Sequence, residues 1–142
     1  MVSVGTLGGD WVVGRDVSAD GSIVVGESKN ALGEWRAFRW TEADGMVSLG
    51  TLGGNESRAV AISPDGSVIV GRSKDATGAW TGFRWSNTDG MQSLMIPGNP
   101  RPASVSAKGS IIVGTYWDRV AQAKIRQAQP FVAMVVTAQV VL

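Results

Sequence analysis

The 142-residue sequence contains no histidine and no cysteine, and these two absences remove most familiar catalytic chemistries. Without histidine there is no Ser-His-Asp or Cys-His arrangement, no His-ligated zinc and no side chain that ordinarily titrates near neutral pH. Without cysteine there is no disulfide, thiolate nucleophile or Cys-ligated metal. We therefore expect no cofactor and no metal centre, and any hydrolysis would have to use serine, lysine or carboxylates.

Charge of one sign and long apolar runs are also scarce. The net charge is +1, so nothing in the sequence predicts nucleic acid as a partner. No stretch reaches the roughly 18 apolar residues of a membrane span. The first five residues lack the charged-then-apolar layout of a secretion signal. Hydrophobic residues make up 44% of the chain, as in a globular protein.

The most informative feature that is present is a repeat of 45 residues. Residues 5–49 and 50–94 align without gaps and agree at 24 of 45 positions. Repeats of this length indicate stacked supersecondary units, none of which can bury its apolar surface alone. The shared landmarks are Gly-Thr-Leu-Gly-Gly, Asp-Gly-Ser followed by a β-branched run and glycine, Phe-Arg-Trp, and Asp-Gly-Met.

The second repeat predicts four short strands joined by hairpins. Residues 59–62 and 67–71 are apolar and flank the turn Ser-Pro-Asp-Gly. Residues 80–85 alternate Phe and Trp with Arg, and residues 91–94 follow the turn Asp-Gly. Four strands of this length in about 45 residues are typical of a β-propeller blade. A solenoid of hairpins is the main alternative.

The third repeat, residues 95–142, keeps the first hairpin and then diverges. Lys108 replaces the turn aspartate, and prolines replace the Gly-Gly pair. Phe131 is the expected counterpart of Phe83. We expect a helical turn within 118–129 and a strand within 131–142.

The expected fold class is therefore all-β, with three four-stranded antiparallel blades in a single domain. Blade 1 covers 5–49, blade 2 covers 50–94 and the divergent blade 3 covers 95–142. Residues 1–4 repeat residues 46–49 and match the fourth strand of a preceding blade. Either the chain is a piece of a longer repeat protein, or this strand completes a blade of this or another copy.

Three blades alone would leave an apolar face at each end, lined by positions such as Phe38, Trp40, Ile111 and Val113. Propeller rings use 4–8 blades, and each large apolar side chain left in water forfeits roughly 1.5–3 kcal/mol. We therefore expect closure into a homo-oligomer, most simply a dimer with six blades in the ring.

The combination of these motifs resembles the HAF repeat, a family of bacterial repeats in extracellular and autotransporter proteins. The resemblance is close over residues 1–94, loose over 95–117 and weak beyond. It implies a bacterial repeat-β module, secreted or displayed at the cell surface in full-length relatives. It implies no reaction, because no catalytic residues belong to the pattern.

Six residues are candidates for ligand binding. Trp35 and Trp80 recur at the start of the third strand and could stack on a sugar, or could instead staple one blade to the next. Arg39 and Arg84 alternate away from the core aromatics, and either pair with an aspartate of a neighbouring blade or contact a ligand. In the first repeat Arg15 and Asp16 replace apolar residues on the innermost strand, where they would face a central channel and either contact a ligand or form a channel-lining ion pair.

The sequence favours a non-catalytic binding scaffold at a surface or in a secreted protein. The first alternative is a carbohydrate-binding lectin with one tryptophan site per blade. The second is a histidine-independent esterase or glycosidase, for which paired carboxylates such as Asp16, Asp20, Glu27 and Glu34 are available.

Overall fold

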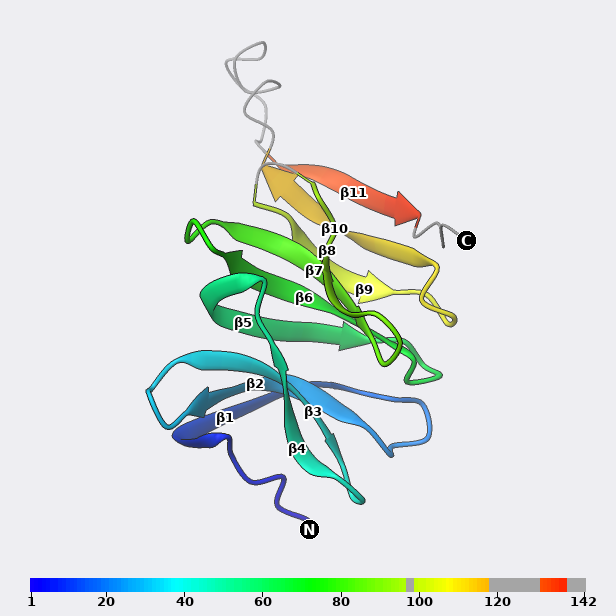
Figure 1. Ribbon diagram of the computed structural model, residues 1–142. Helices are drawn as coiled ribbons and strands as arrows, with labels where there is room; N and C mark the ends of the chain where they lie inside the picture. Colours follow the sequence, from blue (N-terminus) through cyan, green and yellow to red (C-terminus); the bar gives the residue numbers. More distant parts are fainter. Residues whose placement is uncertain (97–98, 118–130, 138–142) are drawn as a thin grey trace.

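The computed structural model describes residues 1–96, 99–117 and 131–137, and every regular element within them is a β-strand. The strands pair antiparallel in three sheets that follow one another along the chain (Figure 1). The expectation of an all-β chain with antiparallel sheets is confirmed.

Each of the first two sheets has four strands in sequence order, and the third has the order β11-β10-β9. The first sheet contains β1 (Gly8–Val17), β2 (Val24–Asn30), β3 (Trp35–Thr41) and β4 (Gly45–Gly50). The second contains β5 (Gly53–Ile62), β6 (Val68–Asp75), β7 (Trp80–Ser86) and β8 (Gly90–Ser93). The third contains β9 (Arg101–Val105), β10 (Ile111–Trp117) and β11 (Phe131–Thr137).

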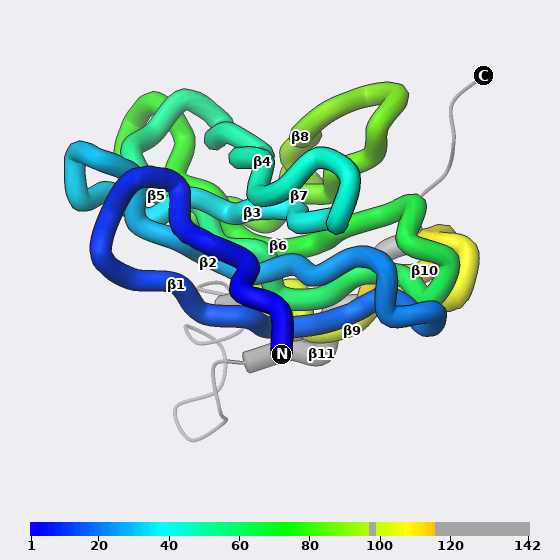
Figure 2. The backbone as a smooth tube through the Cα atoms, turned by 90° about the horizontal axis from the view of Figure 1, so that it is seen from below, coloured from blue at the N-terminus to red at the C-terminus, as the bar shows by residue number. Residues whose placement is uncertain are grey.

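The sheets stack face to face with their first strands along one common edge. Strand β5 packs against β1, β2 and β3 of the first sheet and against β9 of the third. Figure 2 shows β4 and β8 on one side of the stack and β1 and β9 on the other. This is how blades are arranged around a propeller axis. Residues 1–6 belong to no strand, so their pairing with another copy stays a prediction.

The motif Gly-Thr-Leu-Gly-Gly ties the start of each of the first two sheets to its own second strand. The Leu7 amide donates to Ser28 Oγ at 3.1 Å, and the Leu52 amide donates to Ser73 Oγ at 2.9 Å. Both serines are fully buried, and these hydrogen bonds satisfy their hydroxyls. The repeat therefore preserves a specific backbone crossing as well as a pattern of strands.

The first two strands of the second sheet are longer than predicted. Strand β5 starts at Gly53 instead of Ala59, and β6 ends at Asp75 instead of Gly71. The additional residues are largely polar, which hides them from a search for apolar runs. Ser57 shows why they can form a strand: it is fully buried, and its hydroxyl bonds to the backbone of the preceding sheet.

A phenylalanine ring packs over a glycine in each of the first two sheets. A Cβ built on Gly71 would lie 2.8 Å from the Phe83 ring. Phe38 is 0% exposed, so the expectation that it lines an open face is wrong; the Cβ position of Gly26 is 3.1 Å from its ring.

Two apolar clusters join the sheets. The first cluster is formed by Val25, Ala37, Leu49, Ala59, Ile62, Ile69 and Phe83. The second is formed by Ala61, Val68, Val70, Val105 and Ile112.

The strand register corrects one alignment in the third repeat. Gly71 pairs with Phe83 in the second sheet, whereas Gly114 pairs with Met134 in the third. Phe131 is therefore not the counterpart of Phe83. The connection after β10 is longer than the spacing of the aromatic residues suggested.

The expected C-terminal strand is confirmed for residues 131–137. The rest of that expected strand, residues 138–142, and the helical turn expected within 118–129 lie outside the described residues.

Hydrogen bonds to aspartate stabilise the turns that follow β1 and β5. In the second sheet Asp65 Oδ1 accepts from Ser63 Oγ at 2.6 Å, from Ser67 Oγ at 2.7 Å and from the Ser67 amide at 3.0 Å. These hydrogen bonds lower the pKa of Asp65 to about 2, and the bond from Ser63 has the largest effect. Asp20 makes the same contacts with Ser22 and Ser18, and its pKa is also lowered to about 2.

The third turn lacks this acceptor, because Lys108 occupies the position of the aspartate. We expect Lys108→Asp to raise the melting temperature by roughly 2–4 °C, since the serines at 106 and 110 would gain a charged acceptor. Lys108→Ala is the matched control, because it removes the same cation without adding an acceptor. Circular dichroism melts measure the effect, and equal melting temperatures for the two variants would contradict it.

The two aspartates also predict how stability depends on acid. Their folded-state pKa values lie below the ordinary aspartate value near 3.9, so the stability they contribute is complete above about pH 4 and is lost as the pH falls toward 2. We expect Asp20→Asn and Asp65→Asn, combined, to flatten the decline of melting temperature between pH 4 and pH 2. An unchanged slope in that range would show that these turns do not carry the effect.

Candidate functional site

Tryptophans and cations alternate along one edge of the stack. Trp35, at the start of β3, has Lys29 Nζ at 5.6 Å and Arg58 Cζ at 5.5 Å from its ring centroid. Arg58 belongs to β5, so this contact crosses from the first sheet to the second. We call the group the cation–tryptophan row; it consists of Lys29, Trp35, Arg58, Trp80, Arg72 and Lys74.

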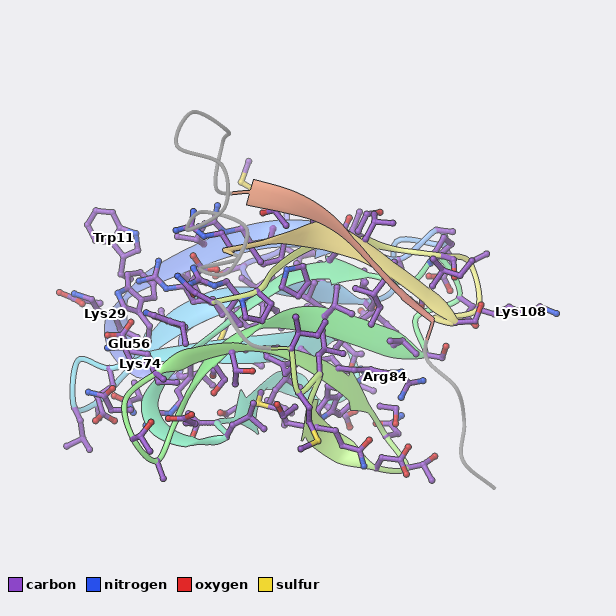
Figure 3. The ribbon with its side chains drawn as sticks, turned by 90° about the horizontal axis from the view of Figure 1, so that it is seen from above. Trp11, Lys29, Glu56, Lys74, Arg84 and Lys108 are labelled. Carbon is purple, nitrogen blue, oxygen red and sulfur yellow. The ribbon has the colours of Figure 1, made fainter. Side chains whose placement is uncertain are left out.

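Trp80, at the start of β7, is more crowded with cations than Trp35. Arg72 Cζ lies 4.7 Å from its ring centroid, Lys74 Nζ lies 5.4 Å away and Arg58 Cζ lies 5.9 Å away. In Figure 3, Lys29, Glu56 and Lys74 lie along the same edge of the molecule. The row thus brings the two predicted tryptophans together with three cations of the second sheet.

Arg39 and Arg84 lie on the middle of β3 and β7, away from this row. Arg39 Nη1 is 4.0 Å from a carboxylate oxygen of Asp44, which belongs to the same sheet rather than to a neighbouring blade. The Nε atoms of both arginines are buried without a hydrogen-bond partner among the described residues. In Figure 3, Arg84 lies far from the edge that carries Lys74. Neither arginine therefore joins the two tryptophans in one site.

Arg15 and Asp16 do not pair with each other. The Arg15 guanidinium binds both carboxylate oxygens of Glu27, and Glu27 is 2% exposed. The hydrogen bonds and charge of Glu27 raise the pKa of Arg15 above its ordinary value. Asp16 Oδ2 instead accepts from the amide of Ile62 at 2.9 Å and so links β1 to β5. Both residues thus have structural partners.

The four carboxylates considered for glycoside hydrolysis are each held by other groups. Asp16 and Glu27 have the partners just described, and Asp20 accepts from Ser18 and Ser22 within its turn. Glu34 forms an ion pair with Arg36 at 2.7 Å. Among the described residues no three acidic side chains are arranged to hold a metal ion.

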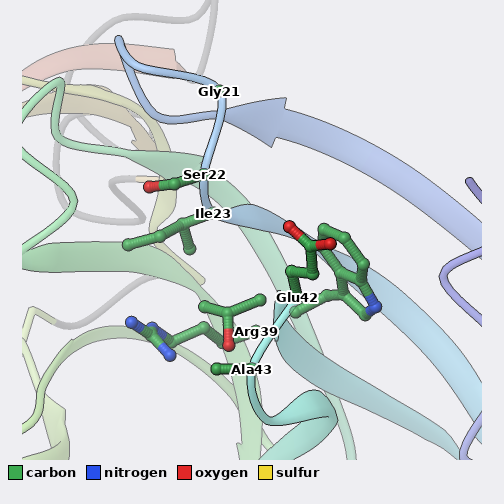
Figure 4. A pocket seen from close by; sticks show the side chains of 8 residues that line it. Gly21, Ser22, Ile23, Arg39, Glu42 and Ala43 are labelled. Carbon is green, nitrogen blue, oxygen red and sulfur yellow. The ribbon is translucent and has the colours of Figure 1, made fainter.

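A hollow of about 390 Å³ lies at the opposite edge, between the β1–β2 turn and the β3–β4 hairpin (Figure 4). It lies at one open end of the stack. Its lining combines turn residues with one cation and one aromatic side chain. The residues are Gly21, Ser22, Ile23, Arg39, Trp40, Thr41, Glu42 and Ala43.

Sequence reasoning overlooked Arg58 and Arg72, which are two of the four cations in the row. They stand directly opposite each other across β5 and β6. The corresponding pair in the first sheet is Val13 and Glu27. A position-by-position comparison of the two repeats would have shown this departure, since both positions change from apolar or acidic to basic.

No helix among the described residues is long and apolar enough to cross a membrane. None of the known protein-family models matches the chain, and no curated protein sequence matches it. The resemblance to HAF repeats therefore stays a prediction.

Solved structures do share the fold. TolB from Acinetobacter baumannii superposes with a TM-score of 0.62 at 16% identity, over 89% of this chain and 30% of that one. A putative TolB from Agrobacterium tumefaciens superposes with a TM-score of 0.66 at 14% identity, over 91% of this chain and 46% of that one. The chain thus spans less than half the length of either neighbour. At such low identity the likeness shows the fold alone, and that fold is β-propeller-like.

Proposed function

We propose that this chain is one half of a non-catalytic, six-bladed β-propeller that two copies form together and that serves as a binding scaffold. Its place is at the cell surface or outside the cell, as the resemblance to HAF repeats implies. One observation carries the proposal. Neighbouring sheets meet through the same contact twice within the chain, and each end of the stack exposes one of the two surfaces that form this contact.

The internal contact places a branched side chain on a turn glycine of the next sheet. A Cβ built on Gly66 would lie 2.6 Å from Ile23 Cδ1, so Ile23 packs closely on this glycine. One sheet further on, a Cβ on Gly109 would overlap Val68 in the same way. Both glycines have positive φ and are buried. Ile111 is the third branched residue of this kind and lies at one end of the stack. Gly21 is the third turn glycine and lies at the other end.

The surface of branched side chains that forms one side of this contact is exposed to solvent in the third sheet. Val68 and Val70 are 2% and 0% exposed because the third sheet covers them. Ile111 and Val113 hold the same positions on β10 and are 44% and 41% exposed. The exposure expected of these two residues is confirmed.

The surface around the turn glycine, which forms the other side of this contact, is exposed to solvent in the first sheet. Ile62 and Val105 are 4% and 9% exposed, whereas Val17 at the corresponding position is 50% exposed. Gly21 is exposed and has no atom within 4 Å of its Cβ position. It also lines the hollow described above. A second copy would set Ile111 on Gly21 and cover Val17.

A backbone hydrogen bond extends the same pattern. The Ala19 amide donates to the carbonyl of Pro64 at 2.9 Å and so joins the turns of the first two sheets. Ala107 holds the equivalent position in the third sheet and has an N–H that Pro64 lacks. In the closed ring the Ala107 amide would donate to the Ala19 carbonyl of the second copy.

Closure predicts a particle of twice the 14.9 kDa chain mass. We expect Ile111→Lys and Val17→Lys each to give monomers in analytical ultracentrifugation, because each places a charge in the contact between copies. Leu32→Lys is the matched control: Leu32 is an exposed leucine in the β2–β3 hairpin, and its replacement should leave the dimer intact. A folded wild-type monomer at micromolar concentration would reject the proposal.

A carbohydrate site at Trp35 and Trp80 stays the second candidate function. Both rings are half-buried at one edge, and neighbouring cations could donate hydrogen bonds to sugar hydroxyls. Their cation contacts also favour the alternative in which they staple the blades together. A histidine-independent hydrolase stays a prediction as well.

We expect Trp80→Ala to lower the free energy of unfolding by about 2–4 kcal/mol, because the ring loses its packing and its contacts with three cations. A chemical denaturation series measures this loss. On a glycan array we expect neither the wild type nor the variant to bind. Binding by the wild type that the variant loses, while Trp35→Ala also weakens it, would favour the lectin instead.

A further inference from the structure

Two arginines on neighbouring strands lie against the ring of Trp80, and a third stands at the equivalent register position of the next sheet. Arg58 and Arg72 stand opposite each other on β5 and β6, and Arg101 opens β9 in the next sheet. Burial, followed by repulsion from Arg101 and Arg58, lowers the pKa of Arg72 below its ordinary value. Like charges directly opposite each other destabilise a strand pair. The three side chains therefore form a local concentration of positive charge that works against folding.

The carboxylates of the described residues leave this charge largely uncompensated. Glu56 lies 3.1 Å from Lys74 Nζ and 3.5 Å from Arg58 Nη2. Within the described part of the chain, no carboxylate oxygen lies within 4.0 Å of Arg72 or Arg101. Among the described residues, Lys74 and Arg58 thus share one carboxylate, and Arg72 and Arg101 have none within that distance.

The hydrogen bonds are incomplete as well. Arg72 Nη2 donates to Asn99 Oδ1, a neutral acceptor held in the left-handed region at φ 59°. The Nε atoms of Arg58 and Arg72 are buried and have no partner among the described residues. A ligand from solvent would meet the terminal Nη groups of these arginines, and the planar fork of a guanidinium matches two oxygens of an oxyanion at once.

The fold itself does not require this charge. At the same register in the first sheet stand Val13 and Glu27, and Arg15 neutralises the glutamate. The third sheet pairs Arg101 with Thr115. The second sheet therefore carries an arginine pair where its neighbours carry none, and Arg101 adds to it from across the sheet boundary.

We propose that Arg58, Arg72 and Arg101 bind the dianionic phosphate group of a small phosphorylated ligand. A phosphate offers three terminal oxygens and two charges, which suits three guanidinium groups better than the single charge of a carboxylate. Arg58 is 39% exposed and Arg101 is exposed, so the group can enter from solvent. The site lies within one chain, so it goes beyond the ring proposal and does not depend on closure by a second copy.

The first test uses inorganic phosphate as the probe. The wild-type protein is titrated with sodium phosphate at pH 7.5 by isothermal calorimetry and by NMR of the tryptophan indole N–H signals, with ionic strength held constant by sodium chloride. We expect saturable binding that shifts the Trp80 signal, since Arg72 lies 4.7 Å from that ring. Sodium acetate at the same concentration should bind at least about tenfold more weakly. Glucose 6-phosphate and phosphoserine, as further arms, distinguish a free phosphate ion from a phosphorylated metabolite.

Variants locate the site. We expect R72Q and R101Q each to weaken phosphate binding by about tenfold or more, because each removes a charged donor. R36Q is the matched control, since Arg36 is already paired with Glu34 at 2.7 Å and should keep wild-type affinity. R101Q keeps the test decisive if R72Q fails to fold, because Arg101 is exposed.

The outcomes separate clearly. Saturable phosphate binding that R101Q loses and R36Q keeps would support the site. Absence of binding above the chloride background, equal binding of acetate, or equal loss in R36Q would each overturn it. The mass of the R101Q particle should equal that of the wild type, so a failed phosphate site and a failed ring are told apart.

Discussion

The stack depends on one steric contact, in which a branched side chain at or just before the start of a sheet's second strand rests on the turn glycine of the following sheet. Ile23 on Gly66 and Val68 on Gly109 are two copies of it. In both copies a glycine on one surface meets a β-branched residue on the other. Each blade supplies both halves on opposite faces, so a linear stack of any length ends with one unfilled half at each end. The proposed closure into a ring would fill both.

Polar tethers fix how neighbouring sheets are placed, and they vary more than the steric contact does. Between the first two sheets, the buried Ser57 accepts from the Ala37 amide at 2.9 Å and donates to the Gly50 carbonyl. In the third sheet the fully buried Pro100 packs instead against the preceding sheet, where it lies 3.4 Å from the Cβ position of Gly82. Hydrogen bonding at one junction and apolar packing at the next occupy a similar place. The repeat can therefore diverge in sequence while the stacking is kept.

Charge is distributed unevenly over this regular frame. Glu27 and Arg15 neutralise each other in the first sheet, whereas Arg58, Arg72 and Arg101 gather at the next boundary. Buried or crowded charge lowers stability unless it is paired. The arginine pair occurs in the second sheet and not at the same position of the other two. A costly feature that the repeat does not share points to a role in binding and not in folding.

The sequence by itself determined the all-β class, the turn positions and the alternation of strands, because β-branched runs, Asp-Gly turns and alternating aromatics act locally. It also indicated that Ile111 and Val113 would lie open. Only the tertiary structure decided which residues meet across sheets. It gave Arg15 a partner in Glu27 rather than Asp16, buried Phe38 and matched Gly114 to Met134. It also placed Arg58 and Arg72 beside Trp80. These outcomes depend on register and on the facing sheet, and a shift of one residue along a strand turns every side chain to the other face.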